Sequence, residues 1–192
     1  MPTFREGKLL FEFPADWQVV HYDIDADPAA GTPAGFYRRV MTSGGVKYVQ
    51  AVDFISRLPN EPERLQFLEV KDDRLDITAE GERRTQLYEA VLSKVASTLA
   101  GLTLAERLGE QMDDDLLRPM ACLSQRPEIE VVLFWVEPPV VGTTLRRTVK
   151  KEGKTLLQQR LAAKLRQWDM PFSLFNLTDR PPVLWQVREV LP

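Results

Sequence analysis

The hydrophobic pattern of the chain changes its period near Glu82, and this change limits the folds that the chain can adopt. Before this point, short apolar runs are bounded by turn residues, a pattern typical of β-strands. After it, apolar residues recur at spacings of three and four, which predicts a helix that ends near Leu108, with Gly109 as the stop signal. The apolar face of this helix consists of Leu87, Val91, Val95, Leu99 and Leu102.

The remaining pattern predicts several strands and one further helix. Strands are expected over residues 8–13, 17–23, 36–42, 46–55, 65–71, 128–137 and 183–191, and a second amphipathic helix is expected over 156–168. Residues 25–35 and 56–64 contain several prolines and polar residues and are expected to be connections. We therefore predict one α/β domain, residues 1–192, with a mixed central sheet flanked by helices.

Composition limits the cellular setting and the partners that we expect. The formal net charge of −3 does not by itself indicate a nucleic-acid partner, although a local basic patch remains compatible with one. The single cysteine, Cys122, cannot form an internal disulfide, which fits a reducing compartment. Neither a signal peptide nor an apolar run of membrane-spanning length is found. These features predict a soluble, cytoplasmic protein.

The stretch LQFLEVKDD, residues 65–73, carries the strongest chemical signal in the chain. Side chains alternate between the two faces of a strand, so Glu69 and Lys71 are expected to lie side by side on one face. Asp53 is expected near the end of the preceding strand, and an antiparallel pairing of the two strands would bring it close to Glu69. Two adjacent carboxylates suit a hard cation such as Mg²⁺, and a nearby lysine can stabilise negative charge on a phosphate.

The segments AVDF, residues 51–54, and FLEVKD, residues 67–72, resemble the core of the PD-(D/E)XK nuclease superfamily, which has the restriction-endonuclease-like fold. The resemblance implies that Asp53 and Glu69 are acidic metal ligands and that the backbone carbonyl of Val70 is an additional metal contact. It also implies that Lys71 is the catalytic lysine. Val52 stands where the name of the family has a proline. Asp23 is the first candidate for the upstream acid that many members carry, and Glu12 is the second.

The resemblance extends over roughly residues 10–168. Over this range the chain is similar to a group of uncharacterised single-domain bacterial proteins of that superfamily. It implies a nuclease that depends on Mg²⁺, with Mn²⁺ as a substitute, and that hydrolyses phosphodiester bonds of nucleic acid, with DNA as the expected substrate. A homodimer or a complex with a protein partner is compatible with this activity. The alternative is a non-catalytic module that keeps the fold as a protein-interaction component of a bacterial defence or regulatory assembly.

Several basic residues are candidates for contacts with nucleic acid. Lys94 is expected on the polar side of the long helix, where it either contacts a phosphate or is simply solvated. Arg38 and Arg74 either contact phosphates or form ion pairs with neighbouring carboxylates. The segment RRTVKKEGK reads as an exposed basic loop that is able to contact phosphates, and it contains Arg146, Arg147, Lys150 and Lys151.

Other common kinds of site are excluded or disfavoured by the sequence. His21 is the only histidine and Cys122 the only thiol, so a histidine-based triad or a zinc cluster is not expected. Residues 112–116, MDDDL, lack the ligand spacing of an EF-hand loop. The glycine-rich motifs that cradle nucleotide phosphates are absent from the sequence.

Overall fold

The computed structural model describes residues 1–26, 34–42, 50–75, 80–111, 114–138, 144–178 and 185–190. Its centre is a five-stranded mixed sheet with the strand order β3-β4-β5-β6-β7. Strands β3, β4 and β5 pair antiparallel, whereas β5, β6 and β7 pair parallel. The strands are β3 (Gln18–His21), β4 (Phe54–Leu58), β5 (Glu61–Asp72), β6 (Glu128–Val136) and β7 (Phe172–Phe175).

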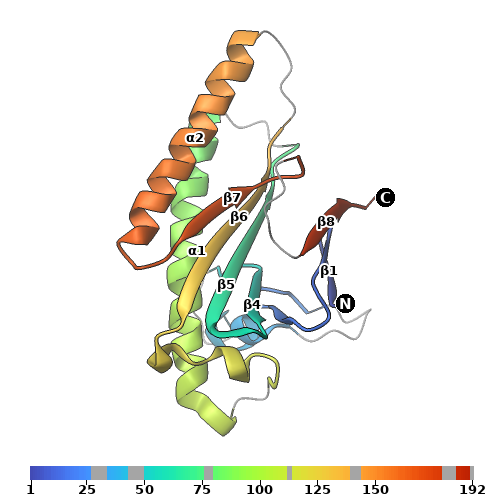
Figure 1. The fold of residues 1–192 in the computed structure, drawn as a ribbon, viewed down its shortest axis with the longest axis vertical. Helices are drawn as coiled ribbons and strands as arrows, with labels where there is room; N and C mark the ends of the chain where they lie inside the picture. The colour runs from blue at the N-terminus through green and yellow to red at the C-terminus, as the bar shows by residue number, and fades with distance from the viewer. Residues whose placement is uncertain are drawn as a thin grey trace.

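Two long helices cover one face of this sheet (Figure 1). Helix α1 (Glu80–Leu108) follows β5, and helix α2 (Thr144–Arg166) follows β6. Parallel neighbours need such crossovers, because the chain must return to the starting edge before the next strand begins. The helix-side core contains Val91 and Val95 of α1, Leu161 of α2, and Phe67 and Leu133 of the sheet.

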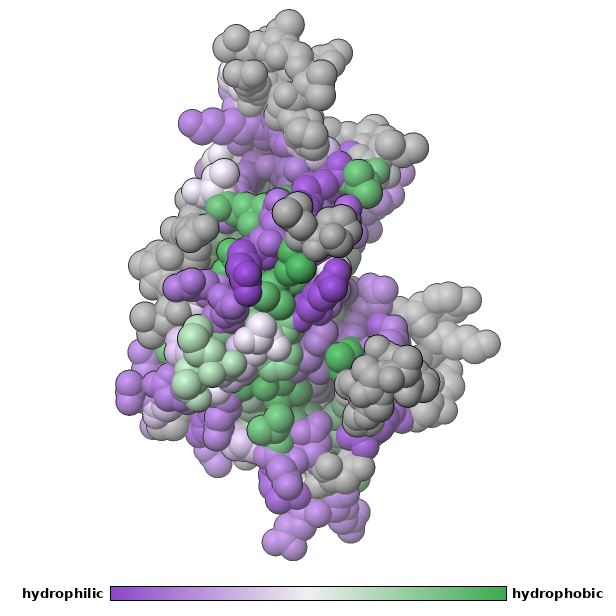
Figure 2. Space-filling model, turned by 90° about the vertical axis from the view of Figure 1, so that its right-hand side faces the viewer, coloured by the Kyte–Doolittle hydropathy of each residue, from purple (hydrophilic) through white to green (hydrophobic). Residues whose placement is uncertain are grey.

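A second, three-stranded sheet covers the opposite face of the central sheet (Figure 1). It consists of β1 (Thr3–Glu6), β2 (Leu9–Glu12) and β8 (Gln186–Glu189), in the order β1-β2-β8. Phe11 and Trp185 pack against Phe134 of the central sheet, with ring centroids 5.5 and 6.1 Å from that of Phe134. Figure 2 views the molecule from this side and shows apolar residues bordered by hydrophilic ones.

Short helical turns complete the described part of the chain. A π-helical turn spans Arg38–Thr42, and 3-10 turns span Gly109–Gln111, Arg118–Met120 and Leu123–Gln125. Gly109 has a φ of +54°, a backbone conformation that glycine adopts readily and that ends α1 where the sequence predicted. None of the described helices is long and apolar enough to cross a membrane.

The α/β class, the mixed sheet, α1 and the strand at 128–136 agree with the predictions from sequence. Of the strand predicted over 46–55, the structure describes residues 50–55. The prediction is wrong for residues 50–53, because β4 begins only at Phe54 and continues to Leu58. The connection predicted over 56–64 is a tight hairpin, since Leu58 pairs with Glu61 and only Pro59 and Asn60 lie between them. Proline favours the first central position of such a turn.

Three further differences concern the ends of the predicted elements. Residues 38–42 form the π-helical turn rather than part of a strand over 36–42. The basic segment that read as a loop is the first part of α2, which therefore begins at Thr144 instead of residue 156. Strands β1 and β7 were not predicted, because four-residue strands carry too few alternating positions to give a clear pattern.

Candidate functional site

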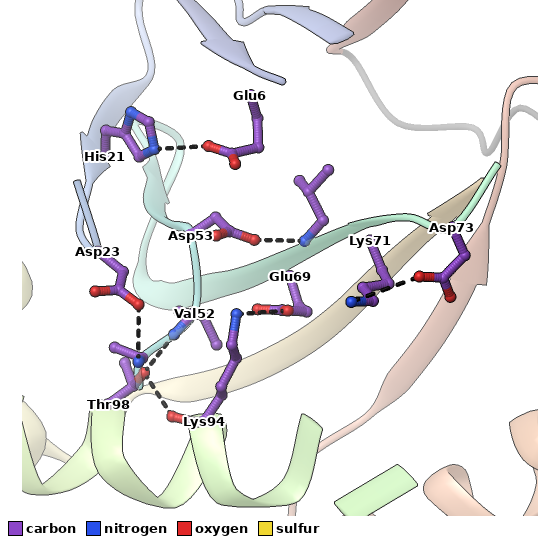
Figure 3. Close-up of polar contacts among 12 residues, drawn as sticks. Glu6, His21, Asp23, Val52, Asp53, Glu69, Lys71, Asp73, Lys94 and Thr98 are labelled. Carbon is purple, nitrogen blue, oxygen red and sulfur yellow. Dashed lines mark hydrogen bonds and ion pairs between the residues drawn. The ribbon is translucent and has the colours of Figure 1, made fainter. Parts of the chain in front are cut away.

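The register of the β4–β5 hairpin brings Asp53 and Glu69 together. Phe54 pairs with Leu68, so Asp53, which directly precedes β4, lies across from Glu69. An Oδ2 atom of Asp53 accepts a hydrogen bond of 2.6 Å from the backbone N–H of Val70 (Figure 3). This bond fixes the orientation of the Asp53 carboxylate. Burial raises the pKa of Asp53, and the Lys94 ammonium and the Val70 N–H oppose this rise.

Glu69 is the most deeply buried acid of the pair, with 3% of its surface exposed. Its Oε1 atom accepts a bond of 2.7 Å from the Lys94 ammonium, whereas its buried Oε2 atom has no hydrogen-bond partner among the described residues. Burial, with the neighbouring carboxylate of Asp53 as the second cause, raises the pKa of Glu69 well above its usual range. Negative charge on both Asp53 and Glu69 is therefore costly unless a cation binds in addition to the Lys94 ammonium.

Lys94 reaches this pair from α1 and is held there by Thr98 (Figure 3). The Thr98 hydroxyl donates to the backbone carbonyl of Lys94 at 2.8 Å and accepts from the N–H of Val52 at 3.1 Å. These bonds tie the middle of α1 to the segment that carries Asp53. Burial lowers the pKa of Lys94, but the carboxylates of Glu69 and Asp53 outweigh this effect, so its pKa is raised.

Lys71 lies farther along β5 and has a different partner. Its ammonium is 3.5 Å from an Oδ1 atom of Asp73, and 48% of its side chain is exposed. Asp73 itself is buried, and its Oδ2 atom accepts a bond of 2.8 Å from the indole N–H of Trp135. The backbone N–H of Asp73 donates to the carbonyl of Val136 at 2.8 Å. Asp73 was not singled out from the sequence, because an acid after a strand usually indicates a solvated turn.

These residues share one cleft of about 290 Å³ between the end of β5 and the first half of α1. Its walls include Glu6, Gln50, Asp53, Glu69, Val70, Lys71, Asp73, Arg83, Gln86, Leu87, Ala90 and Lys94. The structure therefore brings together five predicted site residues, namely Asp53, Glu69, Val70, Lys71 and Lys94.

The upstream acid that lines the cleft is Glu6, not Asp23 or Glu12. Glu6 lies on β1, within 3.2 Å of the His21 ring nitrogen. Asp23 does not line the cleft, because Arg38 lies 2.5 Å from its Oδ1 atom and the Ala51 N–H donates to its Oδ2 atom. Burial raises the pKa of Asp23, and the Ala51 N–H and Arg38 oppose this rise. Sequence reasoning missed Glu6 because β1 itself was not predicted.

Glu12, the second upstream candidate, lies on β2 of the small sheet and pairs with Arg188 at 3.2 Å. It is absent from the cleft walls. Arg38 also contacts Asp25, at 3.3 Å. Glu12 and Arg38 therefore form ion pairs outside the cleft.

The candidate phosphate contacts lie in different surroundings, and Arg74, like Arg38, forms the ion pairs that were its alternative role. Arg74 forms ion pairs with Asp72 and with Glu189 of β8, so it joins the two sheets and is not part of the cleft wall. Lys150 lies 3.8 Å from Glu137 and donates to the carbonyl of Pro138. Lys151 is exposed on α2. Arg146 and Arg147 lie on α2, and their side chains fall outside the described residues.

The Asp53–Glu69 pair offers a divalent cation two carboxylates, and Oε2 of Glu69 is a buried oxygen without a hydrogen-bond partner. This donor set suits Mg²⁺, which is commonly held by one or two carboxylates together with water and substrate oxygens. Among the described residues, no group of three or more His, Cys, Asp or Glu side chains is arranged to hold a metal ion. Protein ligands alone would therefore leave several coordination positions open.

Comparisons with known proteins found no match for this chain. No protein-family model, no curated protein and no solved structure is similar to it at the level of significance required.

Proposed function

We propose that the protein is a metal-dependent nuclease with a restriction-endonuclease-like core, and that it hydrolyses phosphodiester bonds of DNA. The observation that carries the proposal is the shared cleft, in which Asp53 and Glu69 lie across a hairpin and Lys71 follows on the same face of β5. The order of the central elements also supports it, since an antiparallel β3-β4-β5 meander, helix α1 and a parallel β6 agree with the core that the resemblance implies.

Four of the cleft residues have a role in the proposed reaction. Asp53 and Glu69 would hold the cation, and the carbonyl of Val70 would be a further contact. When bound there, Mg²⁺ would supply a Lewis acid for the phosphodiester and would lower the pKa of a water molecule. The Lys71 ammonium, which is half exposed, donates to a phosphate oxygen and stabilises the negative charge that develops on it.

Positive charge near the cleft supports a polyanionic substrate. Burial raises the pKa of Glu137, and the opposing charges are those of Lys150, Lys154, Arg84 and Arg83. Lys150 lies 3.8 Å from Glu137, which directly follows β6, and Arg83 also lines the cleft. This basic region, formed by the start of α1 and the first half of α2, is suited to the phosphate backbone of nucleic acid.

The test is cleavage of supercoiled, linear and single-stranded DNA, and of RNA, by the purified protein with Mg²⁺ or Mn²⁺. We expect cleavage of DNA, and we expect Lys71→Ala to slow it by about 100- to 1,000-fold. Asp53→Asn and Glu69→Gln should abolish it. Lys164→Ala is the matched control, because Lys164 lies near the end of α2 and contacts Gln167 rather than the cleft.

Two results would contradict the proposal. One is undiminished cleavage by folded Lys71→Ala and Glu69→Gln variants, which would assign the activity to a contaminant or to another site. The other is absence of cleavage on every substrate in both metals. That second result would favour a non-catalytic module that acts through a protein partner.

A further inference from the structure

We propose that Lys94 is an internal counter-ion that occupies the position of a cation on Glu69, so that a divalent ion binds only when this ion pair opens. The inference rests on the proposed function because it concerns the same carboxylates. It adds a competition between a side chain and the metal, and it predicts that metal and nucleic acid bind cooperatively.

The Lys94 ammonium lies on one oxygen of the carboxylate that a metal would need. This ammonium is 2.7 Å from Oε1 of Glu69, and the two side chains are only 14% and 4% exposed. Glu69 Oε2, on the same carboxylate, is the buried oxygen without a partner. An ion held by Asp53 and Glu69 would therefore share the Glu69 carboxylate with the Lys94 ammonium (Figure 3).

Electrostatics makes the two cations exclude one another. Like charges a few ångströms apart repel strongly where water is scarce, and the side chains concerned are largely buried. A carboxylate oxygen that accepts a short bond from an ammonium is also less available as a metal ligand. The helix cannot withdraw easily, since Thr98 bonds α1 to the backbone of Val52. The repulsion between the two cations must therefore be relieved by rotation of the Lys94 side chain.

The cleft provides space into which the Lys94 side chain can rotate. Lys94 lines the same open space as Lys71 and Arg83, and its four-carbon stem is flexible. A phosphate in the cleft would attract the ammonium away from Glu69 and free the carboxylate for the metal. Since coupling between two ligands is reciprocal, nucleic acid should tighten metal binding and metal should tighten nucleic-acid binding.

The experiment is a calorimetric titration with MnCl₂, without nucleic acid, of the wild-type chain and four folded variants. We expect Lys94→Gln to bind Mn²⁺ about 10-fold more tightly or better. Lys94→Arg keeps the positive charge and should bind like the wild type. Lys71→Gln removes a cleft lysine whose partner is Asp73, and it should change the affinity far less. In Glu69→Gln/Lys94→Gln the gain should disappear.

The inference is overturned if Lys94→Gln binds Mn²⁺ no more tightly than the wild type, or if the gain persists without Glu69. Should Lys94→Gln fail to fold by circular dichroism, the wild-type chain provides a second measurement. Amine acetylation followed by peptide mapping reports the exposure of each lysine. Labelling of Lys94 should rise as Mn²⁺ is added while that of Lys71 stays constant, and labelling of Lys94 that stays constant or falls contradicts the inference.

These results separate the inference from the nuclease proposal. If Lys94→Gln gains affinity through Glu69 but the wild type cleaves no nucleic acid, the counter-ion role stands and the nuclease proposal fails. If the wild type cleaves DNA and Lys94→Gln gains no affinity, the nuclease proposal stands and the counter-ion role fails.

Discussion

The indole N–H of Trp135 donates a hydrogen bond to the buried carboxylate of Asp73 at 2.8 Å. In the parallel register of β5 and β6, Trp135 lies opposite Lys71. Lys71 precedes Asp73 by two residues in the sequence. The second oxygen of Asp73 is 3.5 Å from the Lys71 ammonium. Asp73 thus connects the core of the sheet, through Trp135, to the lysine of the cleft, through an ion pair.

Two substitutions of Asp73 separate its hydrogen bond from its charge. Asp73→Ala leaves the buried indole N–H without an acceptor and should lower the free energy of unfolding by about 1–3 kcal/mol. Asp73→Asn keeps an oxygen for Trp135, so its loss of stability should be smaller, but it should slow DNA cleavage because Lys71 loses its anionic partner. Urea unfolding and cleavage rates check both effects. Equal losses of stability in the two variants would show that the indole bond contributes little.

The raised pKa of Glu69 predicts how the stability of the fold depends on pH. Because its pKa is raised in the folded chain, the folded state holds the proton more tightly than the unfolded state, and this contribution is lost as the pH rises through the folded pKa. Glu69→Gln cannot titrate. The stability of this variant relative to the wild type should therefore increase as the pH rises above 4.5. Thermal unfolding across this range tests the sign, and a difference that is constant or shrinks would contradict it.

Two glycines of α1 provide a matched pair for packing. A methyl group at Gly101 would overlap the hydroxyl of Tyr22, a rigid side chain that is fully buried, so Gly101→Ala should destabilise the fold by about 1–3 kcal/mol. At Gly81 the added methyl meets open space, and Gly81→Ala should stabilise the helix by up to about 1 kcal/mol. Chemical denaturation measures both. A stabilising Gly101→Ala would mean that Tyr22 can move.

The basic region predicts where nucleic acid binds. Lys151→Glu together with Lys154→Glu should weaken DNA binding and reduce its dependence on salt, because fewer counterions are released. Arg107→Glu together with Arg126→Glu changes the net charge by the same amount at exposed positions, at the end of α1 and before the start of β6. This control should leave affinity nearly unchanged. Fluorescence anisotropy with a labelled duplex at several salt concentrations distinguishes the two pairs.

Local patterns in the sequence were sufficient for several features. The spacing of Leu87, Val91 and Val95 predicted α1, since a helix face depends only on residues within a few turns. The alternation in LQFLEVK predicted that Glu69 and Lys71 share the face of β5 with Phe67, and Phe67 does lie in the helix-side core. The apolar run at 128–136 predicted a strand that is buried in the sheet.

Only the tertiary structure decided which charges meet. The sequence predicted that Asp53 lies close to Glu69, but their direct opposition depends on the register of the hairpin, which shifts between Arg57 and Leu58. The upstream acid of the cleft is Glu6 rather than Asp23, because Arg38 and the Ala51 N–H already bind Asp23. Lys94 meets Glu69 across 25 residues through the docking of α1. Strand register and helix docking depend on long-range partners, and a local period in the sequence carries no information about them.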